Sequence, residues 1–159
     1  MSDWEAAGKS DDWYTPKFVF QELGESFYMD VAAPKEGPRH CPAFTWISSS
    51  SLDKEWRGFI WMNAPFGGRN SLQAWLDKFF EHGNGIALTP DRTSAPWWQS
   101  AYKKADMILF TNGKIKFERP DGSIGKSPGS GVTLWAAGDR AAKSLIRAKS
   151  LGAVVSRAA

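Results

Sequence analysis

Short apolar runs that alternate with segments of helical periodicity constrain the fold of this chain more than any other feature. From Leu72 to Phe80, apolar side chains recur at i, i+3, i+4, i+7 and i+8, which is one face of an α-helix. The runs are five to eight residues long, the length of buried strands: FYMDVAA (27–33), FIWMN (59–63), GIALTP (85–90), MILFTN (107–112) and GVTLWAAG (131–138). Strands joined by helices predict an α/β fold whose mostly parallel sheet carries helices on both faces. The last two runs have no helix between them, so we expect an antiparallel end to the sheet.

Helix start and stop signals lie between these runs. Proline at position 16 suits the start of a helix over residues 17–23, and Gly24 suits its end. Asn70 and Gln73 have the form of a capping box, and Ser94 is the predicted N-cap of a later helix. Gly83 is the predicted end of the second helix. We also expect the last helix over residues 139–152, and a loop over 34–58 that contains one short strand at 43–47.

Length and composition favour one globular domain. The chain has 159 residues, 42% of them hydrophobic, which suits a single core. We expect a flexible N-terminal tail at 1–12, one domain at 13–152 and a C-terminal tail at 153–159. The sequence contains no apolar run long enough for a membrane span, and its start lacks the layout of a secretory signal, so a cytoplasmic protein is predicted. One cysteine and two histidines give no metal-ligand spacing, and we expect no metal.

Positive charge is concentrated near the C-terminus. The net charge is +3, and residues 139–159 hold five basic residues against one acidic residue, a local +4. This excess is compatible with a phosphate-bearing partner, and equally with a solvated helix face.

Polar residues follow several of the predicted strands. Ligands of open α/β sheets bind outside the carboxyl ends of the strands. That rule places Asp30, the segment Asn63-Ala64-Pro65-Phe66 and residues 89–92 along one edge of the sheet.

The segment Asn63-Ala64-Pro65-Phe66 has a specific chemical meaning. It offers a side-chain carbonyl, a backbone carbonyl before proline and an aromatic ring from consecutive residues. Two acceptors on the hydrogens of a planar NH₂ group favour the pyramidal amine, whose lone pair can attack an electrophile, and the ring can stack on the base. The pattern alone also fits an asparagine that ends a loop beside a core phenylalanine.

A family resemblance follows the chain from about Asp12 to Leu134. The segments DDWYTP, FYMDVAA, SLDKEW, FIWMNAPFG, LTPDRTSAPWW, NGKIKF and SPGSGVTLW resemble, in order, those of the phage-type, Dam-like DNA N6-adenine methyltransferases. The resemblance implies a Rossmann-like methyltransferase fold, S-adenosylmethionine as cofactor and double-stranded DNA as partner. For a phage-encoded enzyme it also implies action in the bacterial host, with protection from restriction as a role.

The resemblance also implies residue roles. Asn63, Ala64, Pro65 and Phe66 match the amine-activating motif, usually D/N-P-P-Y/F, with alanine in place of the first proline. The implied cofactor contacts are Tyr14, Thr15, Pro16, Asp30 and Ala32. Ser50 stands where the family commonly has an acidic residue, so Asp53 is the expected substitute.

DNA contacts are expected on basic side chains, because phosphate neutralisation supplies most non-specific affinity. The candidates are Arg69, Arg92, Lys114 and Lys116, and the loops 34–51 and 119–130 are candidates for base reading. An adenine in a duplex must be flipped out to reach such a site. Trp97 and Trp98 can stack on opened DNA or pack in the core, with the core favoured.

Two alternatives remain open. The chain can be a non-catalytic DNA-binding relative, or it can methylate an RNA base or a protein glutamine, since both present planar amines. Binding of S-adenosylmethionine separates the first alternative from an enzyme, and the choice of substrate separates the second.

Overall fold

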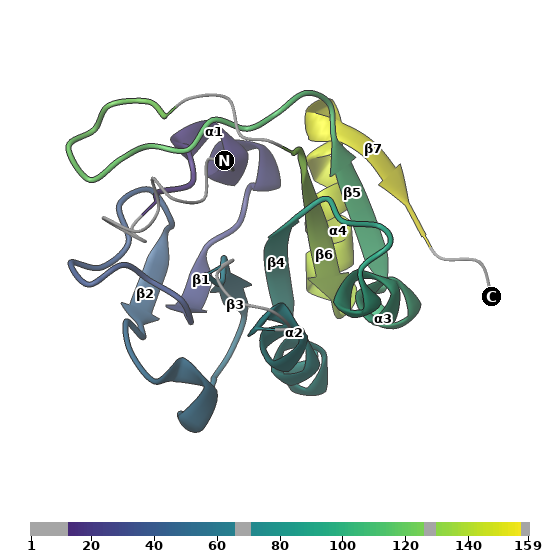
Figure 1. The fold of residues 1–159 in the computed structure, drawn as a ribbon, viewed down its shortest axis with the longest axis horizontal. Coiled ribbons are helices and arrows are strands. Elements are labelled where there is room, and N and C mark those ends of the chain that lie inside the picture. Colours follow the sequence, from purple (N-terminus) through teal and green to yellow (C-terminus); the bar gives the residue numbers. More distant parts are fainter. Residues whose placement is uncertain (1–12, 66–70, 126–129, 157–159) are drawn as a thin grey trace.

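The computed structural model describes residues 13–65, 71–125 and 130–156 (Figure 1). These residues form a seven-stranded sheet with the order β2-β1-β3-β4-β6-β5-β7. The strands are β1 (Phe27–Asp30), β2 (Ala43–Trp46), β3 (Ile60–Met62), β4 (Gly85–Pro90), β5 (Met107–Thr111), β6 (Val132–Ala137) and β7 (Gly152–Val155). The helices are α1 (Lys17–Leu23), α2 (Ser71–His82), α3 (Pro96–Lys104) and α4 (Asp139–Arg147), with 3₁₀ turns η2 (Ser51–Asp53) and η3 (Lys149–Leu151).

The sheet is parallel in its first half and antiparallel in its second. Strands β2, β1, β3 and β4 pair in parallel, whereas β6 pairs antiparallel with both β4 and β5, and β7 pairs antiparallel with β5. The predicted α/β architecture with an antiparallel end is confirmed. Because neighbouring parallel strands end at the same edge, the residues after β1, β3 and β4 share one edge of the sheet.

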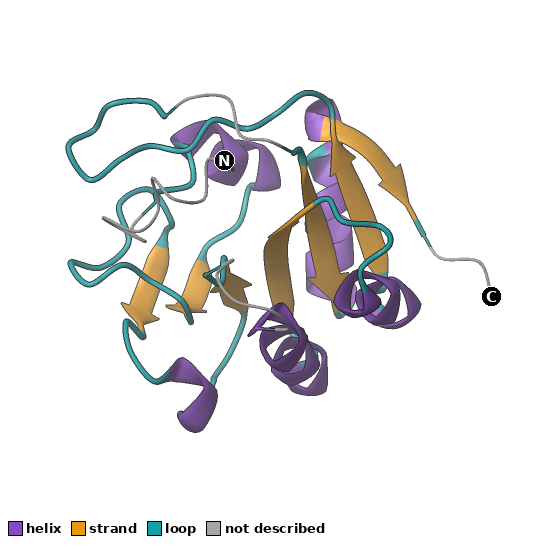
Figure 2. Cartoon of the chain, in the orientation of Figure 1, coloured by secondary structure: helices purple, strands orange, loops and turns teal. Residues whose placement is uncertain are grey.

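Helices cover both faces (Figure 2). One core packs α2 and α3 against the sheet, and the other packs α1 and α4 against the opposite face. In Figure 1, α4 lies behind β5 and β6. Trp97 and Trp98 are 8% and 5% exposed and belong to the first core, where Trp98 stacks on Tyr102 and Phe110. Their core interpretation is therefore correct.

A β-bulge changes which residues of β1 face each core. The N–H groups of Tyr28 and Met29 both point to the carbonyl oxygen of Phe59, at 2.8 and 3.5 Å. Phe27 consequently packs in the core of α1 and α4, while Met29 and Val31 pack in the core of α2 and α3. Asp30, between Met29 and Val31, is thereby turned toward the α1 side.

Helix boundaries follow local signals in most cases. Gly24 adopts a left-handed conformation (φ 63°), and its N–H donates to the carbonyl of Phe20, which ends α1 as predicted. Helix α2 ends before Gly83, also as predicted. The N-cap prediction for Ser94 is wrong: Ala95 occupies that position without a side-chain cap, and α3 begins on Pro96. Asn70 lies outside the described residues.

The C-terminal part differs from the sequence prediction. Helix α4 ends at Arg147 instead of continuing to 152, and the predicted tail is wrong over 153–155, because β7 adds a strand at the edge of the sheet. A Cβ at Gly152 would overlap the carbonyl oxygen of Phe110, so glycine permits this close pairing. The strand GAVV is short and has no clear alternation, which explains why it was not predicted.

Part of the C-terminal positive charge anchors α4. Arg140 and Arg147 pair with Glu25 at 2.6 and 3.1 Å. The hydrogen bond from Arg140 is the largest of the effects that lower the pKa of Glu25. These two arginines therefore attach α4 to the α1–β1 turn, which reduces the charge available to a phosphate-bearing partner.

The α2 core sets much of the stability. Phe79 is fully buried between α2 and the sheet, so Phe79→Ala is expected to lower the free energy of unfolding by about 3–5 kcal/mol. Phe44 is 79% exposed and stacks on Tyr28, so Phe44→Ala is expected to cost less than about 1.5 kcal/mol. Urea denaturation of both variants measures the difference, and equal losses would contradict this description of the core.

Candidate active site

Asp30 and Asn63 lie on the same face of the sheet at the carboxyl edge. Asp30 is in register with Trp61 of the neighbouring strand, and Asn63 follows Trp61 by two residues. Ile60, Met62 and Ala64 pack toward α2 and α3, whereas Trp61 packs toward α1. The alternation of β3 thus continues beyond its last strand residue and turns Asn63 to the α1 side.

A hydrogen bond joins Asn63 to the segment that precedes α1. The Nδ2 group of Asn63 donates to Oγ1 of Thr15 at 3.1 Å. Thr15 is 6% exposed, Ala64 is 2% exposed, and Pro65 is on the surface. The structure therefore brings together the predicted amine-activating residues 63–65 and the predicted cofactor segment 14–16. Phe66 lies outside the described residues.

Asp30 is a buried carboxylate that accepts one hydrogen bond from the described part of the chain. It is 4% exposed, and its Oδ1 accepts the N–H of Ala32 at 3.1 Å. Burial outweighs this bond and raises the pKa of Asp30 to about 7. The nearby Asp30 carboxylate is also the second cause, after burial, that raises the pKa of the Cys41 thiol. Among the described residues no cation pairs with Asp30, so its charge is available to a ligand.

Segment 13–16 is held by a loop that follows β5. Tyr14 and Glu118 exchange two backbone hydrogen bonds, each 2.9 Å long. The Arg39 guanidinium lies over the ring of Tyr14, 3.9 Å from its centroid. Arg119 lies over the ring of Trp13, at 5.4 Å. Tyr14, and with it Thr15, is therefore fixed by residues far away in the sequence.

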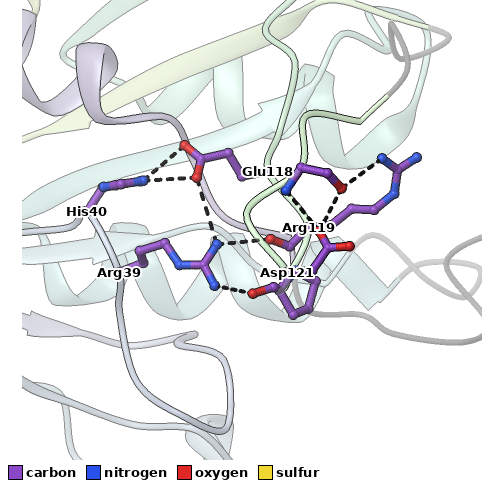
Figure 3. Close-up of polar contacts among 7 residues, drawn as sticks. Arg39, His40, Glu118, Arg119 and Asp121 are labelled. Carbon is purple, nitrogen blue, oxygen red and sulfur yellow. Dashed lines mark hydrogen bonds and ion pairs between the residues drawn. The ribbon is translucent and has the colours of Figure 1, made fainter.

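Arg39 also joins two loops (Figure 3). Its side chain donates to the carbonyl of Arg119 at 2.9 Å and to that of Pro120, and it forms an ion pair of 3.7 Å with Glu118. His40 donates to the same carboxylate at 2.9 Å. The loop between β1 and β2 is thus tied to the loop after β5, which Figure 1 shows in green at the upper left. No local sequence pattern reports these contacts, and Arg39 and Glu118 were not predicted as site residues.

The end of β4 is stabilised from β6. Trp135 donates from Nε1 to Oγ1 of Thr89 at 2.9 Å, and Thr133 donates to the carboxylate of Asp91. Asp91 also donates its N–H to the carbonyl of Gly131. These bonds give Thr89, within β4, and Asp91, directly after it, structural partners and hold the end of the strand in place.

The predicted DNA contacts occupy different places. Lys114 and Lys116 are exposed on either side of Ile115, which is buried at 5% exposure, in the loop whose continuation pairs with Tyr14. Arg92 is exposed and follows β4. Arg69 lies outside the described residues. The two lysines are thus connected to the site through a short stretch of chain, and their role stays a prediction.

The segment SLDKEW forms the 3₁₀ turn η2 and ends in the buried side chain of Trp56. Trp56 is 6% exposed and donates to Oγ of Ser51 at 2.9 Å. Lys78 of α2 donates to carbonyl oxygens of η2 and the residue after it, including that of Leu52 at 2.9 Å. Ser50 has a left-handed backbone (φ 52°), and Asp53 is exposed. Nothing in these contacts assigns a cofactor role to Asp53, which stays a prediction.

The fold and the site together define a class of protein. A sheet that is parallel in its first half, with an antiparallel end and an Asn-x-Pro loop at its carboxyl edge, is consistent with the methyltransferase fold. The chain belongs to the Dam family: the family model described as DNA N-6-adenine-methyltransferase (Dam) matches residues 5–136. Membership in this family implies a DNA adenine methyltransferase. Neither a curated protein nor a solved structure matched the chain.

No helix within the described ranges is long and apolar enough to cross a bilayer. In the same ranges, no three His, Cys, Asp or Glu side chains gather where they could hold a metal ion.

The buried charge of Asp30 predicts a pH-dependent stability difference. The pKa of the Asp30 carboxyl is about 7 in the folded protein and near 3.8 in the unfolded chain, so on raising the pH the unfolded chain releases the carboxyl proton first. The contribution of Asp30 to the free energy of unfolding therefore falls as the pH rises from about 4 to 7. We expect Asp30→Asn to be more stable than wild type at pH 8, by up to about 4 kcal/mol, with the difference vanishing below pH 4. Urea denaturation across this range measures it. A difference that does not change with pH would contradict the raised pKa.

Proposed function

We propose that this protein transfers a methyl group from S-adenosylmethionine to N6 of adenine in double-stranded DNA. The observation that carries the proposal is the orientation of Asn63, whose Nδ2 is taken by Thr15, so that Oδ1 remains an acceptor at the carboxyl edge. Family membership supports the same reaction. Bound S-adenosylmethionine would supply the electrophilic methyl group: the N6–C bond would form as the S–CH₃ bond breaks, and the electron pair of that bond would return to sulfur.

The chain supplies two acceptors for the attacking amine. Oδ1 of Asn63 and the carbonyl oxygen of Ala64 accept the two N6 hydrogens, which localises the lone pair on nitrogen and stabilises the positive charge that grows there. Pro65 has no N–H and restricts Ala64 to an extended conformation, so the Ala64 carbonyl stays out of a helix. The amine then loses one proton to solvent. In this proposal Phe66 stacks on the flipped adenine.

Asp30 fits the cofactor in charge and position. A buried carboxylate that has no cationic partner among the described residues suits the ammonium group or the ribose hydroxyls of the cofactor. Thr15 accepts a hydrogen bond from Asn63, so its own hydroxyl hydrogen remains available to the carboxylate of a methionine moiety. Tyr14, Pro16 and Ala32 complete the proposed cofactor contacts.

The proposed DNA contacts are basic side chains. Lys114 and Lys116 bind phosphates from the loop that leads to Glu118, and Arg92 binds one from the segment after β4. Arg69, which lies outside the described residues, is the fourth proposed phosphate contact. Base flipping costs a few kcal/mol, which stacking and hydrogen bonding of the extruded adenine offset. The same proposal places the protein in the cytoplasm of a bacterial host, where methylation protects DNA from restriction.

Loss of the Asn63 amide should abolish most methyl transfer. Asn63→Ala removes one of the two acceptors, and kcat is expected to fall about 100- to 1000-fold, the usual effect of deleting one preorganised hydrogen-bonding group. The assay measures transfer of labelled methyl to unmethylated duplex DNA, followed by nucleoside digestion. Asn112→Ala is the matched control, because Asn112 is exposed beyond β5 and should tolerate the change.

The products decide between the alternatives. N6-methyladenine from wild type and Asn112→Ala, but not from Asn63→Ala, supports the proposal. Cofactor binding with methylation of RNA or a protein glutamine in place of DNA would overturn it, and so would DNA binding without any cofactor binding.

Cofactor affinity should depend on pH through Asp30. If the carboxylate form binds the cofactor, the dissociation constant of S-adenosylhomocysteine should be about tenfold larger at pH 6 than on the plateau above about pH 8, because the pKa of Asp30 is about 7. Asp30→Asn should bind S-adenosylhomocysteine more weakly, and its dissociation constant should no longer rise as the pH falls from 8 to 6. Calorimetry from pH 5.5 to 8.5 measures the dissociation constants of wild type and variant. The same pH dependence in Asp30→Asn as in wild type would exclude Asp30 as its origin.

A further inference from the structure

We infer that Trp46 is the residue on which the adenine ring of S-adenosylmethionine stacks. The inference deepens the proposed function and rests on it. It follows from the register of β2 with β1, from the exposure of the Trp46 ring and from the glycine that lies against that ring.

Trp46 stands beside Asp30 on the same face of the sheet. The two residues are in register in the parallel pairing of β1 and β2, and side chains of registered neighbours point to the same side. Ile47 packs in the core of α2 and α3, so alternation turns Trp46, the residue before it, to the α1 side. Asn63 lies on that side as well. The three residues Trp46, Asp30 and Asn63 therefore follow one another across the carboxyl ends of β2, β1 and β3, which Figure 1 shows side by side.

The order of these residues matches the order of the groups in the cofactor. In S-adenosylmethionine the ribose lies between the sulfur and the adenine. With the methyl group at Asn63 and the ribose hydroxyls at Asp30, the adenine lies beyond Asp30, on the side of β2. Neighbouring strands are about 4.8 Å apart, which brings the base within reach of the Trp46 indole. The target adenine of DNA does not compete for this ring, because Asn63 is two strand spacings, or about 10 Å, from Trp46.

One face of the Trp46 ring is covered by the loop after β1. A Cβ at Gly37 would lie 3.0 Å from both Cε2 and Cζ2 of the ring and 3.3 Å from Nε1. Nearly equal distances to three adjacent ring atoms are those of a group above the ring and not at its edge. The N–H of Gly37 donates to the carbonyl of Pro34 at 2.8 Å, and its φ of +92° suits glycine, so a tight turn closes against the ring. Trp46 nevertheless remains 48% exposed, which leaves its opposite face for a planar base.

The binding test removes the aromatic face. Trp46→Ala should raise the dissociation constant of S-adenosylhomocysteine about 5- to 100-fold, the usual effect of removing the aromatic partner of a stacked base. Trp46→Phe keeps an aromatic ring and should stay within about fivefold of wild type. Phe44→Ala is the matched control, because Phe44 is an exposed aromatic residue of the same strand that stacks on Tyr28, and its loss should leave the affinity unchanged. Calorimetry measures all four proteins, and a dissociation constant of Trp46→Ala equal to that of wild type would overturn the inference.

A spectroscopic readout tests the stacking itself. The chain has nine tryptophans, and the difference between the emission of wild type and that of Trp46→Phe isolates Trp46. Saturating S-adenosylhomocysteine should remove most of this difference, because a stacked adenine quenches the indole. Emission from Trp46 that does not change at saturation would overturn the inference and would assign a loss of affinity in Trp46→Ala to the structure of the loop.

The kinetic readout separates binding from catalysis. Stacking on the adenine acts equally in the ground state and the transition state, so kcat of Trp46→Ala at saturating cofactor should stay within about threefold of wild type while KM for the cofactor rises. A large fall in kcat with unchanged KM would overturn the inference. Wild type that binds S-adenosylhomocysteine with quenching of Trp46, but forms no N6-methyladenine in DNA, would instead contradict the proposed function and leave the stacking role intact.

Discussion

The pairing of β1 with β3 is the constraint on which the candidate site depends. Asp30 and Trp61 are in parallel register, so the residues that follow both strands emerge at one edge. The bulge at Tyr28 and Met29 is part of this pairing, because both N–H groups use the carbonyl of Phe59. With regular alternation from Phe27, which packs toward α1, Asp30 would face the α2 side. The extra residue reverses that direction and places the carboxylate on the same face as Asn63.

The site is completed by contacts that are distant in sequence. The residues before α1 reach Asn63 through Thr15, and a loop more than one hundred residues further along holds them through Tyr14 and Glu118. Arg39 ties that loop to the turn after β1 with hydrogen bonds, an ion pair and its contact with the Tyr14 ring. The site is held in place by loop-to-loop contacts: the loop between β1 and β2 binds the loop after β5, which in turn pairs with Tyr14. A change in the loop after β5 can therefore alter the geometry at the strand ends.

Much of the fold could be predicted from sequence because its signals are local. Pro16 and Gly24 bound α1, and the run from Gly85 to Pro90 is a fully buried strand, as its composition indicates. The missed features are those that tertiary contacts decide: β7 forms because β5 offers an edge, and Ala95 replaces Ser94 as the N-cap because Pro96 begins the helix. For the site, the rule that ligands bind at the carboxyl ends of strands pointed to Asp30 and Asn63, and the family resemblance added Thr15. These signals could not predict the bond between Thr15 and Asn63 or the Arg39 contacts, since neither leaves a periodic pattern.

The alanine in the motif illustrates how the surrounding packing compensates for a lost proline. Ala64 is 2% exposed and packs in the core of α2 and α3, together with Ile60 and Met62. Its side chain thus anchors the first loop residue to the core, while Pro65 restricts its backbone from the other side. The carbonyl that the proposed mechanism uses belongs to Ala64, whose side chain is held in the core and whose backbone is restricted by Pro65. Since Asn63 alternates to the opposite face, burial of Ala64 also orients the amide toward Thr15. Replacement of the first proline is therefore compatible with an ordered site.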